Sequence, residues 1–232
     1  MSSSQVSHPE QADHRVDSAP ANGAHDTHGA DDAHEAHGSR GTRGHGLLEP
    51  FLARQRARQA NRRIPARLRK GRILDIGCGS FPYFLSHTYF AEKFAIDQLA
   101  PATTPPDILW TTLNLNAEPQ LPFEDGYFDA ITMLAVVEHL NPNSLVTLFR
   151  EAYRTLKPGG VLIVTTPSAW SDTILHVMAR VRLVSPEEIN EHVYAYTLPL
   201  LGWYFGRAGF DMDKTRFGYF EMMMNMWAVA TR

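Results

Sequence analysis

The sequence predicts an α/β fold with a doubly wound, mostly parallel seven-stranded sheet and helices on both faces. Three observations carry this prediction. Short apolar runs alternate with helical patterns from residue 72 onward, and strands separated by helices usually pair in parallel. A glycine turn, within ILDIGCGS at 73–80, directly follows the first of these runs. KPGG at 157–160 then marks a sharp helix end before the β-branched run VLIVTT.

The first 46 residues form a compositionally separate tail. They hold seven of the eleven histidines, many Asp, Ala and Gly, and almost no large apolar side chains. Such a segment cannot bury enough surface to offset its ordering entropy, so we expect disorder over 1–46 and a folded domain over 47–232. Weak divalent-metal binding through the imidazoles stays open as an alternative.

A basic helix is expected at the start of the domain, over about 47–70. Leu48, Phe51 and Leu52 recur at helical spacing, and alanines continue the apolar face. Residues 51–72 carry nine Lys or Arg and no acid. A solvated helix face, near an anionic ligand or not, explains this charge best, because no aromatic ladder or nucleic-acid motif accompanies it.

The remaining elements follow in order. Ser80 and Pro82 suit the cap and first turn of a short helix after the glycine turn. Further helices are expected from Pro142 to about Leu156, after the capping box at 185–188, and from Thr197 to the RAGF stop. The expected strands are Arg72–Ile76, Lys93–Asp97, Ile108–Leu113, Phe128–Leu134, 161–166, 211–217 and 225–231.

The composition of the chain excludes several classes of protein. The net charge of −3 gives no general attraction to polyanions, and the single cysteine, Cys78, excludes a disulfide within the chain. No window approaches the length of apolar residues that a membrane span needs, and the first residues lack the apolar core of a secretory signal. We therefore expect a cytoplasmic protein without a membrane span.

The glycine turn points to a ligand when it is considered together with Asp97. Asp97 closes the second expected strand, 20 residues after Gly77, where an acid can accept hydrogen bonds from ribose hydroxyls. A dinucleotide site would have a third glycine where this chain has Pro82, and no P-loop lysine follows. Asp75 would repel phosphate and attract an ammonium group. A ribosyl ligand that bears an amine and lacks phosphate describes S-adenosylmethionine (SAM).

These segments, with LNAEPQLPFEDGYFDAITMLAVVEHL and LFREAYRTLKPGGVLIVTTPS, resemble the class I SAM-dependent methyltransferases over about residues 70–232. The resemblance is closest to the branch that methylates small molecules. It implies a Rossmann-like sheet with SAM as the cofactor. The cofactor site that it implies comprises Asp75, Gly77, Cys78, Gly79, Asp97 on the ribose, Asn116 and Ala117 beside adenine, and Leu134 through its backbone.

Glu138-His139 matches a recurring Glu-His pair of this family. Relatives that hold a divalent ion there have a further acid three residues before the glutamate, where this chain has Ala135, so we predict no metal site. His139 is a candidate general base, because imidazole titrates near neutral pH; bracing of the following loop is the alternative. His192 is a second candidate, in a stretch that relatives often place over the active site.

The substrate pocket is expected within 168–224, where aromatic and methionine side chains gather. Such side chains suit an apolar pocket with polar handles, although an ordinary core is the alternative for each one alone. The candidate pocket residues are Trp170, Tyr194, Tyr196 and Phe220.

The sequence therefore predicts methyl transfer from SAM to an oxygen or nitrogen of a small molecule of phenolic, sugar or lipid type, helped mainly by in-line positioning. An RNA or DNA methyltransferase that uses the basic helix is the first alternative, and it lacks NPPY-type and PC-type signatures. A non-catalytic module that keeps the fold is the second. An NAD-dependent oxidoreductase is more distant, because of Pro82.

Overall fold

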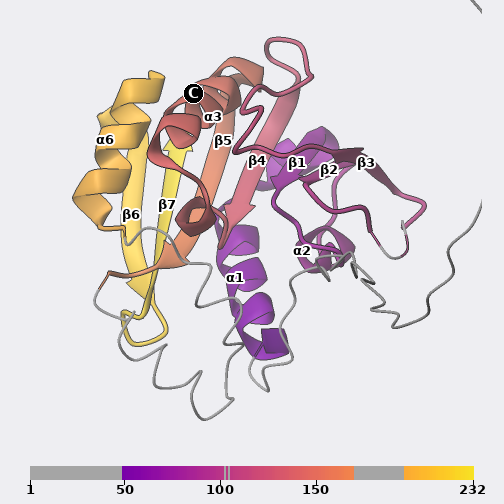
Figure 1. The fold of residues 1–232 in the computed structure, drawn as a ribbon, viewed down its shortest axis with the longest axis horizontal. Helices are drawn as coiled ribbons and strands as arrows, with labels where there is room; N and C mark the ends of the chain where they lie inside the picture. The colour runs from indigo at the N-terminus through magenta and orange to yellow at the C-terminus, as the bar shows by residue number, and fades with distance from the viewer. Residues whose placement is uncertain (1–48, 102, 104, 170–195) are drawn as a thin grey trace, which may run out of the picture. The chain divides into compact units, whose positions relative to one another are not determined.

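A computed structural model describes residues 49–101, 103, 105–169 and 196–232 of the chain. In this part, seven strands lie side by side in one sheet of order β3-β2-β1-β4-β5-β7-β6 (Figure 1). The strands are β1 Arg72–Ile76, β2 Glu92–Asp97, β3 Ile108–Thr112, β4 Phe128–Leu134, β5 Leu156–Pro167, β6 Thr215–Phe220 and β7 Asn225–Thr231. The helices are α1 Glu49–Arg63, α2 Tyr83–Ser86, α3 Pro142–Thr155 and α6 Leu198–Ala208, with short 3-10 turns at Ala66–Lys70, Val137–His139 and Met212–Lys214.

The sheet is parallel except for one strand. β1 pairs in parallel with β2 and β4, β2 with β3, and β4 with β5. β7 alone runs antiparallel, between β5 and β6. The predicted doubly wound, mostly parallel seven-stranded sheet is therefore confirmed.

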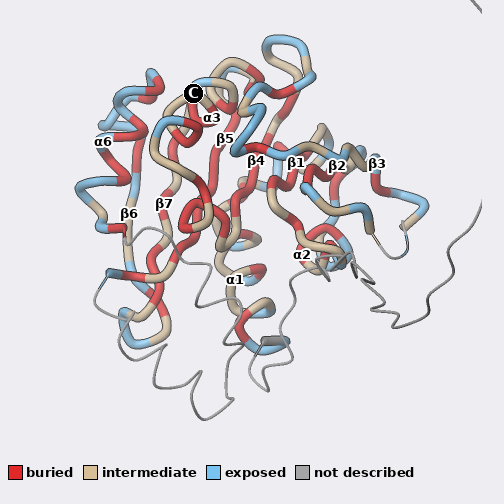
Figure 2. Tube along the Cα trace, viewed as in Figure 1, coloured by how far each residue is buried: buried red, intermediate tan, exposed pale blue. Residues whose placement is uncertain are grey.

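Successive residues of the central strands have their side chains buried on opposite faces of the sheet. Leu74 and Ile76 belong to a core cluster that includes residues of α3 and α6, while Ile73 belongs to a second cluster with Ala57 and Ala60 of α1. This alternation follows from the period of two in a strand. Figure 2 shows that the buried residues concentrate along β1, β4 and β5. Helices on both faces leave the strand ends as the places where a ligand can approach.

Several predicted boundaries hold and three need correction. α6 begins after Thr197, whose side chain accepts a hydrogen bond from Leu200 N, and it ends at the left-handed Gly209. Ser80 does not cap α2, because Pro82 occupies that position and no side chain caps it. The strand expected at 211–217 starts only at Thr215, since Asp211 caps a 3-10 turn before it. The capping box at 185–188 lies outside the described residues.

The third correction concerns the KPGG segment. α3 ends at Thr155 as expected, but KPGG lies within β5 and forms an irregularity rather than a loop before the strand. The pairing of β5 with β4 jumps from Leu156 opposite Phe128 to Val161 opposite Ala130. Gly159, with φ of 79°, supplies the left-handed residue that such a bulge favours.

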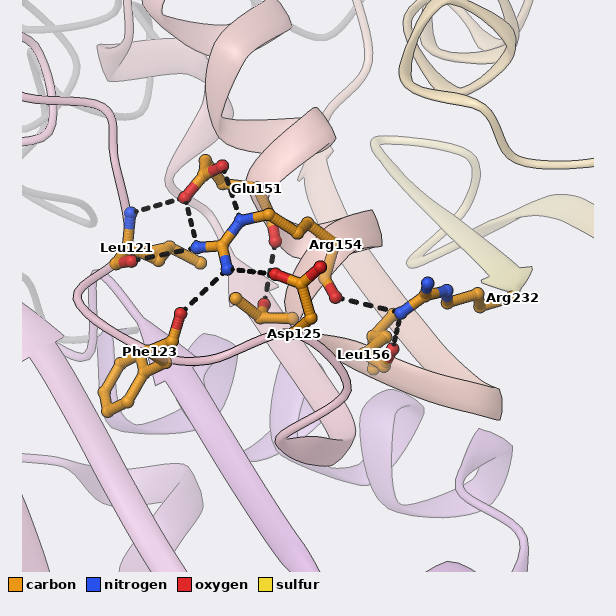
Figure 3. Close-up of polar contacts among 8 residues, drawn as sticks. Leu121, Phe123, Asp125, Glu151, Arg154, Leu156 and Arg232 are labelled. Carbon is orange, nitrogen blue, oxygen red and sulfur yellow. Dashed lines mark hydrogen bonds and ion pairs between the residues drawn. The ribbon is translucent and has the colours of Figure 1, made fainter.

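Arg154 fastens the loop that leads into β4 to the end of α3 (Figure 3). Its guanidinium donates to both carboxylate oxygens of Glu151, to Asp125 at 2.7 Å, and to two backbone carbonyls of the loop, those of Leu121 and Phe123. Glu151 also accepts from Leu121 N at 3.0 Å. The hydrogen bonds that Arg154 donates to Glu151 and then to Asp125 raise the pKa of Arg154 above its usual value, and the bond from Arg154 lowers the pKa of Glu151.

Arg154→Met should lower the free energy of unfolding by about 2 kcal/mol, because it keeps the apolar stem but leaves Glu151 and two carbonyls without their donor. The melting temperature should fall by roughly 4–8 °C in a thermal scan at pH 7. Because the folded-state pKa of Glu151 is lowered, this stabilisation is present above the ordinary carboxyl value of 4.5 and is lost as pH falls through the folded value.

Arg150→Met, one turn earlier on α3, is the matched control. Arg150 is exposed and makes one 3.3 Å hydrogen bond to the carbonyl of Arg207, so its loss should change stability by less than about 0.5 kcal/mol. Equal effects of the two substitutions would show that the Arg154 contacts add nothing to stability.

Candidate functional site

The glycine turn at the end of β1 can be built only with glycine at its first position. Gly77 has φ of 71°, and its N–H donates to Ile96 O of β2 at 2.7 Å. A Cβ at this position would lie 2.4 Å from Cγ2 of Val136, in the segment after β4. Gly79 also has positive φ, of 67°. The turn therefore needs left-handed backbone and lets the ends of β1 and β4 approach closely.

Asp97 lies beside this turn at the carboxyl end of β2, and it is 9% exposed. Its Oδ2 accepts from Gly79 N at 2.8 Å and its Oδ1 from Leu99 N at 3.1 Å. The carboxylate thus fixes the glycine turn and keeps further lone pairs on both oxygens for a ligand. The structure brings together the two features that the sequence linked, the glycines and the acid.

Asp75 lies within β1, inside the strand that the sequence predicts over Arg72–Ile76. It is 3% exposed, and its Oδ1 accepts from Thr132 Oγ1 of β4 at 2.6 Å. Its carboxylate therefore joins two central strands beneath the turn. Cys78 is likewise buried, with its Sγ 3.8 Å from Ile96 O. Whether either residue contacts a ligand stays a prediction.

Asn116 connects two loops at the sheet edge. Its Oδ1 accepts from Asn141 N at 2.9 Å and from Asn141 Nδ2 at 3.2 Å, and its Nδ2 donates to His139 O at 3.0 Å. The resemblance implies that Asn116 lies beside adenine, but its amide oxygen already accepts two hydrogen bonds. A contact of this oxygen with adenine stays a prediction and requires Asn141 to give way. Ala117 is exposed beside it.

The chain turns sharply after β4. Leu134 is half-buried, and Ala135 has φ of 58°, a left-handed conformation that costs a non-glycine residue roughly 1 kcal/mol or more. Ala135 N donates to Thr165 O of β5 at 2.9 Å. This strained residue sets the direction of the following Val137–His139 turn, which carries the predicted Glu-His pair.

Glu138 is the functional candidate that sequence reasoning missed. It is 2% exposed, and its Oε2 accepts from Thr166 Oγ1 of β5 at 3.0 Å. Its Oε1 is buried and meets no hydrogen-bond partner within the described part of the chain. The signal in the sequence was an acid inside the otherwise apolar run MLAVVEHL. His139, by contrast, is only half-buried.

Only two of the predicted pocket residues lie in the described part. Tyr196 is 1% exposed and belongs to the hydrophobic core, and Phe220 is 9% exposed. Both are buried, as the core alternative predicts for each alone. Trp170, His192 and Tyr194 lie outside the described residues, so their roles stay predictions.

The tip of the β6–β7 hairpin lies against the end of β5. Ser168 Oγ contacts the carbonyl oxygens of Met223 and Met224 at 2.8 and 3.0 Å. Glu221, Met222 and Met223 all have left-handed φ values, and Met222 and Met223 are 84% and 59% exposed. Burial raises the pKa of Glu221, against smaller opposite effects of the Arg56 charge and the Asn225 hydrogen bond. A strained tip with two exposed methionines therefore flanks the strand ends.

The described part of the chain holds neither a metal-binding cluster nor a membrane-spanning helix. Among residues 49–101, 103, 105–169 and 196–232, no three His, Cys, Asp or Glu side chains gather in a way that could hold a metal ion. The absence of a metal site stays a prediction for the chain as a whole. None of the described helices combines the length and apolar character needed to cross a membrane.

Comparison with known proteins gives one family match. Residues 48–215 match the model of a methyltransferase domain. The chain matches no curated protein.

Solved structures share the fold at low sequence identity. A SAM-dependent methyltransferase from Archaeoglobus fulgidus is 16% identical, with a TM-score of 0.62 over 80% of this chain and 97% of that one. A protein described as a possible histamine N-methyltransferase, from Thermotoga maritima, is 16% identical, with a TM-score of 0.58 over 80% and 91%. A Haloferax volcanii complex of the Trm112 methyltransferase activator with a putative methyltransferase contains a chain that is 15% identical, with a TM-score of 0.57 over 80% and 95%.

Proposed function

Because this chain belongs to the methyltransferase-domain family, we propose that it uses SAM to methylate an oxygen or nitrogen of a small-molecule acceptor. The observation that supports the proposal most is the pairing of the glycine turn with Asp97, whose Oδ2 accepts from Gly79 N at 2.8 Å. SAM supplies a methyl group made electrophilic by a positively charged sulfur. The residues of the chain bind, orient and enclose the two reactants.

The residues around the turn fit SAM. The backbone of Gly77 approaches Val136 so closely that a Cβ has no room, and such glycine cradles admit a ligand to the backbone. Asp97 keeps lone pairs for two ribose hydroxyls after its bonds to Gly79 and Leu99. Asp75, Cys78 and Leu134 complete the proposed cofactor side. Asn116 and Ala117 are proposed to border adenine, beside a turn in which both of their N–H groups donate to Asn114.

The acceptor side is proposed at the carboxyl ends of β4 and β5. At this edge the acidic side chain of Glu138 is buried. The side chains of Met222 and Met223 are exposed at the neighbouring hairpin tip. Methionine surfaces adapt to apolar ligands of varied shape. This setting suits a small acceptor with an apolar body and one polar handle, of phenolic, sugar or lipid type. Tyr196, Phe220, Trp170, Tyr194 and His192 stay secondary candidates for this side.

The basic segment supports a nucleic-acid acceptor less well. Arg63 stacks on Trp227 at 3.6 Å, Arg69 donates to Asn61 and Thr88, and Arg72 pairs with Glu92. Three of the nine basic side chains of residues 51–72 are thus occupied within the protein. A cytoplasmic location belongs to the same proposal, supported by the single free cysteine.

A screen for S-adenosylhomocysteine release tests the acceptor class. The full chain is incubated with SAM and with phenols, amines, sugars, lipids, tRNA or duplex DNA in separate arms. We expect release with one of the small-molecule arms and none with nucleic acid. Release that requires nucleic acid, and that falls steeply with salt, would replace the proposal with the nucleic-acid alternative. SAM binding without release in any arm would favour a non-catalytic module.

A further inference from the structure

The side-chain carboxylate of Glu138 is buried, and one of its two oxygens accepts no hydrogen bond from a described residue. The residue is 2% exposed, its Oε2 accepts from Thr166 Oγ1, and its Oε1 has no partner in the described part of the chain. No described Lys or Arg forms an ion pair with it. Buried polar atoms are normally satisfied, and an isolated buried charge is costly. An oxygen left in this state is suited to a partner that arrives with a ligand.

The sheet order places Glu138 on the β5 side of the glycine turn, away from Asp97. The glycine turn ends β1 and Asp97 ends β2, whereas Glu138 follows β4 and bonds to Thr166 of β5. In this order β4 lies between β1 and β5. A ligand spread from Asp97 across the glycine turn therefore has its ribose on the β2 side. The atom that attacks its methyl group has to approach from the β4–β5 side, where Glu138 lies.

The backbone around Glu138 is fixed on both flanks. Ala135, three residues earlier, is held left-handed while its N–H donates to Thr165 O. The carbonyl of His139, the next residue, accepts from Asn116 Nδ2 at 3.0 Å. With Thr166 restraining one carboxylate oxygen, the other oxygen is held in position before any ligand binds. Such preorganisation is what positioning of an acceptor requires.

We propose that Oε1 of Glu138 accepts the hydrogen of the attacking hydroxyl group of the acceptor, an inference that rests on the proposed function. As the hydroxyl oxygen bonds to the methyl carbon, the carbon–sulfur bond breaks and its electron pair stays on sulfur, which becomes neutral. The hydroxyl proton passes to the Glu138 carboxylate and leaves to water after product release. Glu138, rather than His139, is thus the catalytic residue, and the acceptor class is a neutral hydroxyl compound.

Glu138→Gln is the decisive variant, because it keeps the size of the side chain and a partner for Thr166 but cannot take a proton. Three quantities are measured on the full chain: SAM affinity by titration calorimetry, melting temperature, and kcat with phenol and with the more acidic 4-nitrophenol. We expect SAM affinity within about 2-fold and an unchanged or higher melting temperature. The kcat with phenol should fall by roughly 10²-fold or more, and less with 4-nitrophenol, which is already partly ionised near neutral pH.

Two further variants sharpen the result. Glu124→Gln, at an exposed position in the loop before β4, is the matched control and should leave all three quantities unchanged. Thr166→Val removes the hydroxyl that orients Glu138, so kcat should fall by about 10-fold while SAM affinity is kept.

Every other outcome overturns the assignment. Unchanged kcat in Glu138→Gln, or a loss in His139→Gln alone, would transfer the role to another residue. A joint fall of melting temperature and SAM affinity would show that Glu138 is structural. Wild-type protein that binds SAM but methylates no hydroxyl compound among the phenols, sugars and lipids of the acceptor screen would exclude the hydroxyl class while leaving the proposed function intact. Failure of the wild type to bind SAM would instead contradict the proposed function itself.

Discussion

Gly77→Ala should lower the free energy of unfolding by about 3 kcal/mol and should weaken SAM binding by roughly 10²-fold or more. The new methyl group would lie 2.4 and 2.8 Å from the two Cγ atoms of Val136, on backbone with φ of 71°. Both the left-handed strain and the clash act at the point where the cofactor is proposed to lie. The melting temperature, measured with and without SAM, reports both the loss of stability and the loss of SAM binding. Without SAM it should fall by roughly 6–12 °C relative to the wild type. Added SAM should raise the melting temperature of the variant only slightly.

Gly126→Ala is the matched control for strain alone. Gly126 has φ of 64°, yet a Cβ there would meet no atom within 4 Å. Its substitution should cost about 1 kcal/mol and leave the SAM-induced rise in melting temperature unchanged. If the two alanine variants behaved alike, close approach of Val136 to the glycine turn would have no energetic importance.

Asp97→Ala should weaken SAM binding by about 10²-fold. The side chain has two tasks in this account: it accepts from Gly79 N and Leu99 N, and it is proposed to accept from the ribose hydroxyls. Charge-assisted hydrogen bonds contribute about 1.5–3 kcal/mol each, so loss of even two of them reaches this magnitude. Equilibrium dialysis with radiolabelled SAM measures the affinity directly.

Asp97→Asn separates the two tasks. The asparagine oxygen can still accept from Gly79 N, but the side chain loses its charge and one acceptor. Its SAM affinity should fall between those of the wild type and Asp97→Ala, with a nearly normal melting temperature. Wild-type affinity in both variants would remove Asp97 from the site.

Most of the fold could be predicted because local signals and tertiary structure agree. The strands at Arg72–Ile76, Phe128–Leu134 and Asn225–Thr231 have the expected bounds, since β-branched or apolar runs end at glycines, charges or turns. The predictions failed where pairing overrides a turn signal. KPGG normally ends an element, but here hydrogen bonds with the C-terminal residue, Gly159 N to Arg232 O and Arg232 N to Gly160 O, draw it into β5.

The site could be predicted only in part. The Gly79–Asp97 pairing follows from parallel strands whose carboxyl ends meet at one edge, and the spacing in the sequence was enough to suggest it. The Glu138–Thr166 contact joins residues 28 apart whose side chains have no pattern in common. The same holds for the amide of Asn116, which bonds to residues 23 and 25 positions away. Such contacts depend on loop geometry that no local signal encodes.

Titration calorimetry of the full chain with SAM and with S-adenosylhomocysteine tests the central claim most directly. We expect saturable binding of both compounds at one site per chain, with dissociation constants below about 1 mM and with affinity that drops in Asp97→Ala. Adenosine triphosphate and NAD should bind far more weakly, because the chain has Pro82 in place of a third glycine and no P-loop lysine for their phosphates. Absence of binding heat with SAM and S-adenosylhomocysteine, or tighter binding of NAD than of SAM, would contradict the assignment of a SAM site.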